Sequence, residues 1–422
     1  MKRKSLLVLS LFVLALVTGV ATVAVRAQDV TTVKFWHTYN ETSPENDMLT
    51  KTLIPEFEKD HPNIKVESVP YPYDQFRQTM LTALAGEEGP DLARLDIIWT
   101  PEFAKQGVLA PLSDVLPDFK TYADKVFPGP LSTNLYKEKY YGLPLDTNTR
   151  VFLYNATIYK AAGLDAPPKT IDELAAQCDK VKALGKDDFV FSDGGTSGWN
   201  VLPWIWSFGG DIVSPDQTTA TGYLNGDKTI AAYQFLADMT KKGCFSDGMT
   251  GSGFDSGANY FTDKVSAIFD GPWMFPIAAG QYPDFKIQTA LVPAGDGGSI
   301  SVVGGEDIVL FANTMKDEAR KNAALEFLKF TQSDEYQLKM SETGQLTVLP
   351  ALLENDYYKN HPYYGIFLEQ LKTARARLPN PNWTAIEEVL SNAGQSIILG
   401  EMTPKEALDA AVDEINPLLA DK

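Results

Sequence analysis

The stretch YGLPLDTNTRVFLYN, residues 141–155, places the polar tetrapeptide Asp146–Thr149 between two apolar runs. The second run has the pattern of a strand that ends at Tyr154 and Asn155. A short polar segment between two apolar runs is typical of a surface turn. The alternative is that the chain crosses here between two lobes and that the polar side chains line the space between them. The choice depends on whether the rest of the chain can form two lobes.

Strand-like and helix-like segments alternate before this stretch. The apolar patterns predict strands over 31–39, 63–71 and 91–98 and helices over 47–59, 73–85 and 101–106. This order predicts a parallel sheet covered by helices, with its ligand-binding loops at the carboxyl ends of the strands.

A second alternation begins after Tyr154, with a capping box formed by Thr170 and Glu173. Its predicted strands are 264–273, 285–293 and 305–313, and its predicted helices are 156–162, 171–184, 228–242, 256–263, 316–332, 334–342, 364–376, 385–399 and 404–419. A chain of 422 residues is also too long for one ordinary core. The fold class is therefore predicted as α/β with two lobes.

The N-terminus has the pattern of an export signal. Lys2, Arg3 and Lys4 precede an apolar run that ends near Val25, and small residues follow up to Ala27. We expect residues 1–27 to be a cleaved signal peptide and the protein to be exported. An uncleaved membrane anchor is the alternative.

Charge and cysteine content fit an exported protein. Removal of residues 1–27 takes away four basic residues and no acid, which changes the formal charge from −18 to −22. Such a surface repels nucleic acid and anionic lipid, so neither is expected as a partner. The two cysteines, Cys178 and Cys244, are predicted to form one disulfide on compartment grounds, with two buried free thiols as the alternative.

Catalytic and metal-binding patterns are sparse. The chain has three histidines, no G-x-S-x-G stretch and no metal-ligand spacing, so we expect no metal, no cofactor and no hydrolase triad. A glycosidase needs two carboxylates about 5–10 Å apart, which a sequence does not reveal. That alternative stays open through six acids at strand ends or turns: Glu41, Asp91, Asp96, Asp146, Asp270 and Glu306.

Tryptophan is the enriched residue type. Of seven tryptophans, five stand beside turn residues: Trp36, Trp99, Trp199, Trp273 and Trp383. Aromatic rings pack on the apolar faces of sugars, while polar side chains bond the hydroxyl rim. We predict that Trp36, Trp199 and Trp273 face a cleft, whereas Trp204 and Trp206 belong to the core.

Taken in order, nine segments resemble one known family. The chain is similar to the extracellular solute-binding proteins of ABC importers, specifically the carbohydrate cluster that includes maltose- and trehalose-binding proteins. The segments are VKFWHTYN, IPEFEKDHPNIKVE, GPDLARLDIIWTPEFAKQGVLAPL, YGLPLDTNTRVFLYN, AAGLDAPPKTIDEL, WSFGGDIV, KVSAIFDGPW, GGEDIVLFANTMKDEARKNAALEFLKF and GQLTVLP. The lipobox cysteine of many Gram-positive relatives is absent, which favours a free periplasmic form or a secreted form held at the cell surface in another way.

The resemblance implies a periplasmic-binding-protein fold: two α/β sandwich domains joined by three hinge crossings. Lobe 1 is then 28–144 plus 307–357, and lobe 2 is 148–304 plus 364–422. The hinges fall near 143–149, 304–307 and 357–364. Under this reading the polar tetrapeptide is a crossing, with its side chains at the cleft floor.

The same resemblance implies which residues bind ligand. Trp273, in the turn DGPW, matches a family tryptophan that stacks on sugar, and Asp96 and Asp146 match acids that accept sugar hydroxyls. Arg77 and Arg375 are also proposed for ligand binding, and the alternative for each is a place on a solvated helix face. The complete predicted ligand-binding set is Trp36, His37, Asn40, Glu41, Arg77, Asp91, Asp96, Trp99, Asp146, Thr147, Asn148, Trp199, Asp270, Gly271, Trp273, Gly304, Gly305, Glu306, Arg375 and Trp383.

The expected function is capture of a neutral sugar or oligosaccharide between the lobes and delivery to the membrane permease of an ABC importer. We expect a monomer without catalytic activity. The alternatives are a secreted carbohydrate-active enzyme and a receptor for another solute.

Overall fold

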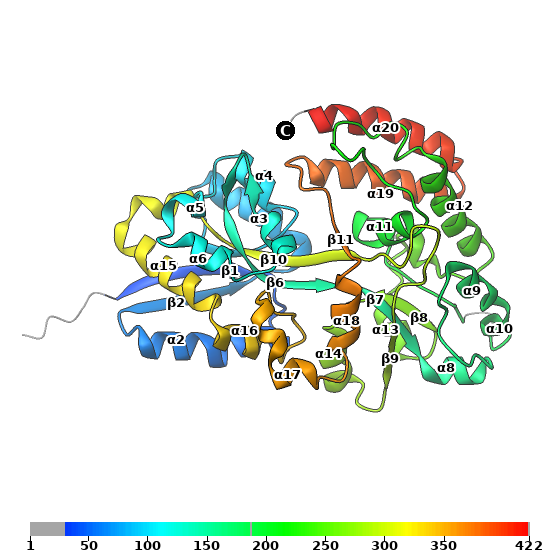
Figure 1. Ribbon diagram of the computed structural model, residues 1–422, viewed down its shortest axis with the longest axis horizontal. Helices are drawn as coiled ribbons and strands as arrows, with labels where there is room; N and C mark the ends of the chain where they lie inside the picture. The colour runs from blue at the N-terminus through cyan, green and yellow to red at the C-terminus, as the bar shows by residue number, and fades with distance from the viewer. Residues whose placement is uncertain (1–29, 186–187, 421–422) are drawn as a thin grey trace, which may run out of the picture.

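The computed structural model describes residues 30–185 and 188–420 and shows two lobes side by side (Figure 1). The predicted signal peptide, residues 1–27, lies outside the described residues. Within the described ranges, no helix has both the length and the apolar character that a membrane crossing needs.

A six-stranded sheet forms the centre of the first lobe. Its strands run in the order β11-β10-β3-β1-β2, with β6 also paired to β10. Strands β1, β2 and β3 are mutually parallel, as the alternation of strands and helices predicts, whereas β10 is antiparallel to β3. The bounds are β1 Thr31–His37, β2 Ile64–Pro70, β3 Leu92–Asp96, β6 Gly142–Thr149, β10 Val302–Leu310 and β11 Arg375–Ala376.

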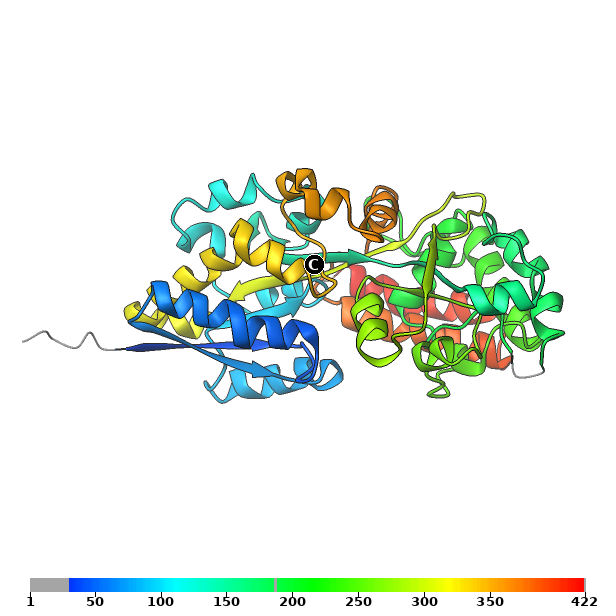
Figure 2. The same cartoon turned by 90° about the horizontal axis from the view of Figure 1, so that it is seen from below.

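Helices cover this sheet on both faces (Figures 1 and 2). Ser43 caps the first of them by accepting a hydrogen bond from Asn46 N, and Pro44 occupies the first turn, so the helical run begins three residues before the predicted start. Phe327 of α15 packs edge-on against Phe35 of β1, with ring centroids 5.5 Å apart. The elements of this lobe are α1 Pro44–Met48, the π-helix Leu49–Leu53, α2 Ile54–Asp60, α3 Tyr73–Ala85, α4 Thr100–Lys105, α5 Leu112–Val115, α6 Phe119–Ala123, α7 Pro128–Ser132, the hairpin strands β4 Leu135–Tyr136 and β5 Lys139–Tyr140, α15 Glu318–Thr331 and α16 Asp334–Ser341.

The second lobe is built on a three-stranded antiparallel sheet, β8-β7-β9. Trp204 is fully buried beside it against Phe191, Phe245 and Phe269, and Trp206 is also buried, which confirms that both indoles belong to the core. The elements are β7 Val151–Asn155, α8 Ala156–Ala161, α9 Ile171–Ala176, α10 Cys178–Lys182, α11 Gly198–Ser207, α12 Asp227–Lys241, α13 Ser256–Phe261, β8 Ala267–Asp270, α14 Met274–Gln281, β9 Ile287–Ala290, α19 Trp383–Leu399 and α20 Pro404–Ala420.

The polar tetrapeptide is not a turn. Asp146–Thr149 continues β6 as buried strand, and Arg150 alone separates β6 from β7 of the other sheet. Alongside it, β10 pairs antiparallel, so that Glu306 lies opposite Asp146 and Gly304 opposite Asn148. Figure 2 shows this two-stranded connection running from one lobe into the other. The polar segment remains extended because its backbone groups are hydrogen-bonded to β10.

A third connection passes through α17 Asp356–Lys359 and α18 Tyr364–Leu371. The helix predicted over 364–376 ends at Leu371, because Arg375 N bonds Ser301 O and the chain joins β10 as strand β11. The exact lobe boundaries and the three hinge segments remain predictions.

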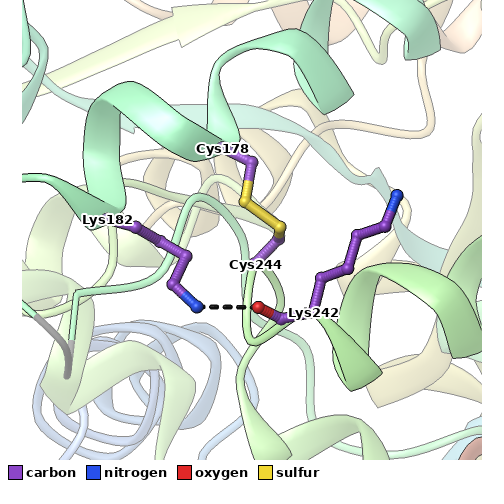
Figure 3. The surroundings of a disulfide bond; sticks show 4 residues. All are labelled: Cys178, Lys182, Lys242 and Cys244. Atoms are coloured by element: carbon purple, nitrogen blue, oxygen red, sulfur yellow. Dashed lines mark hydrogen bonds between the residues drawn. A yellow bond between two sulfur atoms is a disulfide. The ribbon is translucent and has the colours of Figure 1, made fainter.

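The predicted disulfide is present. Cys178 at the start of α10 bonds Cys244, which follows α12, with their Cα atoms 5.3 Å apart. Beside it, Lys182 Nζ donates to the carbonyl of Lys242 at 2.7 Å (Figure 3). The bridge therefore ties two helices of the second lobe together, as the cysteine positions predict.

Candidate ligand-binding cleft

Side chains from both lobes and from the β6–β10 ribbon line a cavity of 430 Å³. A second cavity of 790 Å³ shares five of its lining residues, so the two form one cleft. The inner cavity is lined by Tyr73, Arg94, Asp96, Asn148, Ser197, Trp199, Trp273, Gly304, Gly305, Glu306, Gln345, Arg377 and Glu387. Both volumes fall in the range of small-molecule sites.

Trp199 and Trp273 form an aromatic wall on the second-lobe side. Their rings are stacked with centroids 6.5 Å apart and an interplanar angle of 30°. Gly304 permits this approach, since a Cβ there would lie 2.8 Å from the Trp199 ring. Gly271 does the same for Trp273, whose ring would lie 2.1 Å from a Cβ at that position. The wall thus requires glycine at both positions.

Asp270 lies beside the second ring. Its carboxylate accepts a hydrogen bond from Gly271 N at 2.8 Å. Burial raises the pKa of Asp270 to about 6, although Arg150, this hydrogen bond and the Trp273 side chain lower it in part.

A buried arginine organises the first-lobe side. Arg94 Nε donates to Asp146 at 3.0 Å, Nη2 lies 2.5 Å from Glu306, and Nη1 donates to Thr38 at 2.8 Å. Its guanidinium also lies 4.2 Å from the centroid of the Tyr39 ring. Burial raises the pKa of Glu306 well above its ordinary value, against the opposing charge of Arg94.

A second buried arginine lies across the cleft floor. Arg377 donates to Asp96 at 3.2 Å, and Tyr73 donates its hydroxyl to the same carboxylate at 2.7 Å. The guanidinium lies 5.4 Å from the Trp199 ring centroid. Glu387 lies against Gly198, and burial raises its pKa, although Arg377 lowers it in part.

Three buried polar atoms of the inner cavity have neither a hydrogen-bond partner nor an ion-pair partner among the residues that the structure describes. They are the acceptors Asn148 Oδ1 and Gln345 Oε1 and the donor Arg377 Nε. Unpaired buried polar atoms are costly, so a ligand that carries both donors and acceptors would be stabilised here.

Eight of the residues that the sequence proposes for ligand binding line the cleft: Asn40, Asp96, Asn148, Trp199, Trp273, Gly304, Gly305 and Glu306. Four others support lining residues. Asp146 bonds Arg94, Thr147 donates to Gly304 O at 3.2 Å, and Asp270 and Gly271 lie beneath the Trp273 ring. Glu41 lines a neighbouring hollow of 620 Å³. Contact of any of these residues with ligand stays a prediction.

Three proposed tryptophans lie in the interior, which corrects their placement. Trp36 packs on Tyr71 at 4.7 Å between ring centroids, and Trp99 stacks under Tyr73 at 5.1 Å. Trp383 is fully buried, with its ring against Gly198. Trp36 lies within β1, Trp99 precedes α4 and Trp383 begins α19. Each side chain points into the core, a direction that a neighbouring turn residue does not reveal.

Four charged or titratable residues are also placed elsewhere. His37 is buried and bonds Ser68 at 2.7 Å, and burial together with the charge of Arg94 lowers its pKa to about 3. The others form ion pairs outside the cleft: Asp91 with Arg320, Arg77 with Glu102, and Arg375 with Asp211. A charged side chain near a strand end finds its partner through the tertiary fold, so sequence position alone misplaced them.

Six residues that line the inner cavity were missed: Tyr73, Arg94, Ser197, Gln345, Arg377 and Glu387. Arg94 carried a usable signal, because an arginine inside the apolar strand DLARLDII must be buried with a partner. Arg377 lies two residues beyond the proposed Arg375.

The fold and the cleft define a two-lobed binding protein, and the comparisons identify its family. Residues 43–338 match the family model described as bacterial extracellular solute-binding protein, and the chain belongs to this family. A binding protein of Brucella abortus is 28% identical over 86% of this chain and 88% of its own length. The sn-glycerol-3-phosphate-binding periplasmic protein UgpB of Escherichia coli is 26% identical over 96% of both chains.

Solved structures agree on the fold. An ABC transporter solute-binding protein from Thermotoga lettingae, bound with α-D-tagatose, is 27% identical and superimposes with a TM-score of 0.81 over 92% of this chain and 100% of its own. The GacH receptor of Streptomyces glaucescens, at 23% identity and a TM-score of 0.81 over 93% and 99%, shows the same fold.

Proposed function

We propose that the cleft captures a neutral sugar or short oligosaccharide and that the protein delivers it to the membrane permease of an ABC importer. We further propose that the protein is exported to the periplasm or cell surface, acts as a monomer and does not cleave its ligand. The solute-binding family and the relative bound with α-D-tagatose support this proposal.

The pairing of Trp199 and Trp273 with unpartnered polar atoms is the observation that carries the proposal. A sugar presents an apolar C–H face and a rim of hydroxyls, each of which both donates and accepts. The indole wall suits the face. Asn148 Oδ1 and Gln345 Oε1 can accept from hydroxyls, and Arg377 Nε can donate to one.

The charge of the cleft favours an uncharged ligand over a phosphate. Arg94 and Arg377 are already ion-paired, and four carboxylates surround them, with no lysine among the described lining residues of either cavity. A phosphate would have to displace these carboxylates and would be repelled by the rest. The four are Asp96, Asp146, Glu306 and Glu387. We therefore propose that this cleft does not share the sn-glycerol-3-phosphate specificity for which UgpB is named.

Capture follows from lobe closure. Open and closed arrangements differ by a few kcal/mol, and a ligand that touches both lobes favours the closed one. A micromolar Kd corresponds to about −8 kcal/mol, which one stacked face and several hydrogen bonds can supply.

A thermal-shift panel followed by calorimetry tests the proposal. D-tagatose, maltose, maltotriose and sn-glycerol-3-phosphate are compared. We expect a sugar to raise the melting temperature and the phosphate to have no effect. Stabilisation by sn-glycerol-3-phosphate alone would contradict the proposal, and cleavage of maltotriose on long incubation would favour the enzyme alternative.

Trp273→Ala should then weaken binding of the identified sugar by at least about tenfold, equal to about 1.4 kcal/mol, because one face of the wall is lost. Phe275→Ala is the matched control. Its ring, two residues along the chain, stacks on Tyr363 at 3.6 Å and lines a different hollow. Equal affinities in the two variants would exclude Trp273 from the site.

A further inference from the structure

Arg150 occupies the point where the β6–β10 ribbon enters the second lobe. It is the single residue between β6 and β7, and its side chain is 3% exposed. It does not line either cavity of the cleft. Its backbone carbonyl accepts from Ser301 Oγ at 2.7 Å, which fixes the residue to the chain that leads into β10.

Every nitrogen of its guanidinium is engaged. Nη2 donates to the two oxygens of Asp193 at 2.7 and 2.8 Å and to Phe269 O at 2.6 Å. Nε also donates to Phe269 O, at 3.2 Å. Nη1 donates to Trp199 O at 2.9 Å and to Asn200 Oδ1 at 3.2 Å. A planar fork can hold three separate segments in this way, whereas a lysine ammonium cannot.

Two of these segments carry the aromatic wall. The bonds to Trp199 O and Asn200 fix the first turn of α11, and the guanidinium lies 5.5 Å from the centroid of the Trp199 ring. The bond to Phe269 O fixes the end of β8. The next residue, Asp270, accepts from Gly271 N at 2.8 Å, and Gly271 lies directly against the Trp273 ring. One side chain therefore connects to both indoles from behind, through two independent routes.

Charge reinforces the connection. Asp193 is buried and Asp270 is half-buried, and both interact with the positive charge of Arg150. A shift of the guanidinium would therefore change two things: its attraction for Asp270, beside Trp273, and its hydrogen bond to Trp199 O.

We propose that Arg150 is a positioning residue that sets the separation and tilt of Trp199 and Trp273, and thereby the affinity of the cleft, without touching the ligand. The affinity part of this inference rests on the proposed function. The geometric part does not, and it is tested without ligand.

The ligand-free test uses the exciton coupling of the two indoles. Stacked indoles 6.5 Å apart should give an exciton couplet in the circular-dichroism band of tryptophan, measured as the difference between the wild type and Trp273→Phe. We expect Arg150→Lys to lose most of this couplet. In the Trp273→Phe background, where the couplet is absent, Arg150→Lys should leave the spectrum unchanged. A merely structural role would change the spectrum in both backgrounds.

Arg320→Lys is the matched control. Arg320 also pairs with a buried aspartate, Asp91 at 2.5 Å, but it lies in the first lobe away from the indoles. It should lower thermal stability and leave the couplet unchanged. A couplet retained in Arg150→Lys would overturn the proposal.

The second readout is the Kd for the sugar that stabilises the wild type in the panel of D-tagatose, maltose and maltotriose. We expect at least a tenfold loss in Arg150→Lys and no change in Arg320→Lys. Unchanged affinity with a lost couplet would overturn the affinity part of the inference. If no sugar binds the wild type, the proposed function fails, whereas the couplet still decides the positioning role.

Should Arg150→Lys fail to fold, Asp193→Asn provides the test. It removes the charged partner that orients Nη2 and keeps the arginine. The proposal is supported if Asp193→Asn reduces the couplet and leaves the spectrum of Trp273→Phe unchanged. An unchanged couplet overturns it.

Discussion

Asp307 on β10 gives the chain a pH-dependent stability that one substitution should remove. Its carboxylate is fully buried and accepts hydrogen bonds from three neutral side chains: Thr100 at 2.8 Å, Asn134 at 2.6 Å and Thr133 at 3.3 Å. Burial raises the pKa of Asp307 from 3.8 to about 8, although these donors lower it in part.

The sign and size follow from proton linkage. Between pH 5 and 7 the folded protein holds a proton on Asp307 that the unfolded chain has released. The contribution is fully present below pH 3.8 and is lost as the pH rises through about 8. One such proton changes the free energy of unfolding by about 1.4 kcal/mol per pH unit, or roughly 2.5 kcal/mol from pH 5 to pH 7.

Asp307→Asn cannot carry the charge and should lack this dependence. The asparagine keeps an acceptor for Asn134 and can donate to the Thr100 hydroxyl. Denaturant unfolding of wild type and variant at pH 5 and 7 measures the effect. The stability of the wild type relative to the variant should fall by roughly 2.5 kcal/mol between the two pH values.

Asp91→Asn is the control, since Asp91 is equally buried but ion-paired with Arg320. Loss of the buried carboxylate charge, to which Arg320 and Thr314 are bonded, should destabilise the protein at both pH values. A difference between wild type and Asp307→Asn that stays constant from pH 5 to pH 7 would refute the assignment of a buried, protonated Asp307.

Two further predictions concern Gly344, which lies against the backbone of Trp273, and the disulfide. Gly344→Ala, at φ +101°, would place a Cβ 3.1 Å from both Pro272 O and Trp273 Cα, whereas Gly298→Ala, at φ +104°, meets nothing within 4 Å. Both should cost about 1–2 kcal/mol in backbone strain, but calorimetry should show weaker sugar binding only for Gly344→Ala, and equal affinities would contradict this. Replacing Cys178 and Cys244 by serine opens a link across a sequence separation of 66, so denaturant unfolding should show a loss of about 4 kcal/mol, and a loss below about 1 kcal/mol would argue against it.

The alternation of apolar segments was sufficient to predict the parallel part of the first sheet. Strand β3 and helix α3 lie within a few residues of their predicted bounds, because local pattern and tertiary burial agree there. The prediction failed after Leu371, where a pairing with β10 distant in sequence replaced the local helix preference. Long-range pairing has no local signal.

The candidate site was likewise predictable only in part from the sequence. The sequence analysis named Trp199, Trp273 and the glycines beneath them, Gly304 and Gly271, and the structure brings all four to the cleft wall. Arg377 and Glu387 enter the cleft from the C-terminal segment, and nothing near them in the sequence indicates that side. The apolar pattern alone left open whether the polar tetrapeptide forms a surface turn or a crossing between lobes. The resemblance of nine segments to a family predicted the crossing.

The sequence by itself determined the α/β class, the export signal as a prediction, the disulfide and the tryptophan-bearing turns, because each depends on composition, spacing or local periodicity. Only the tertiary structure decided which indoles face the cleft, which acids pair with Arg94 and Arg377, and that Arg150 lies behind both rings. These facts depend on the directions in which side chains leave elements far apart in the chain, and those directions are fixed only when the two sheets and their ribbon are assembled.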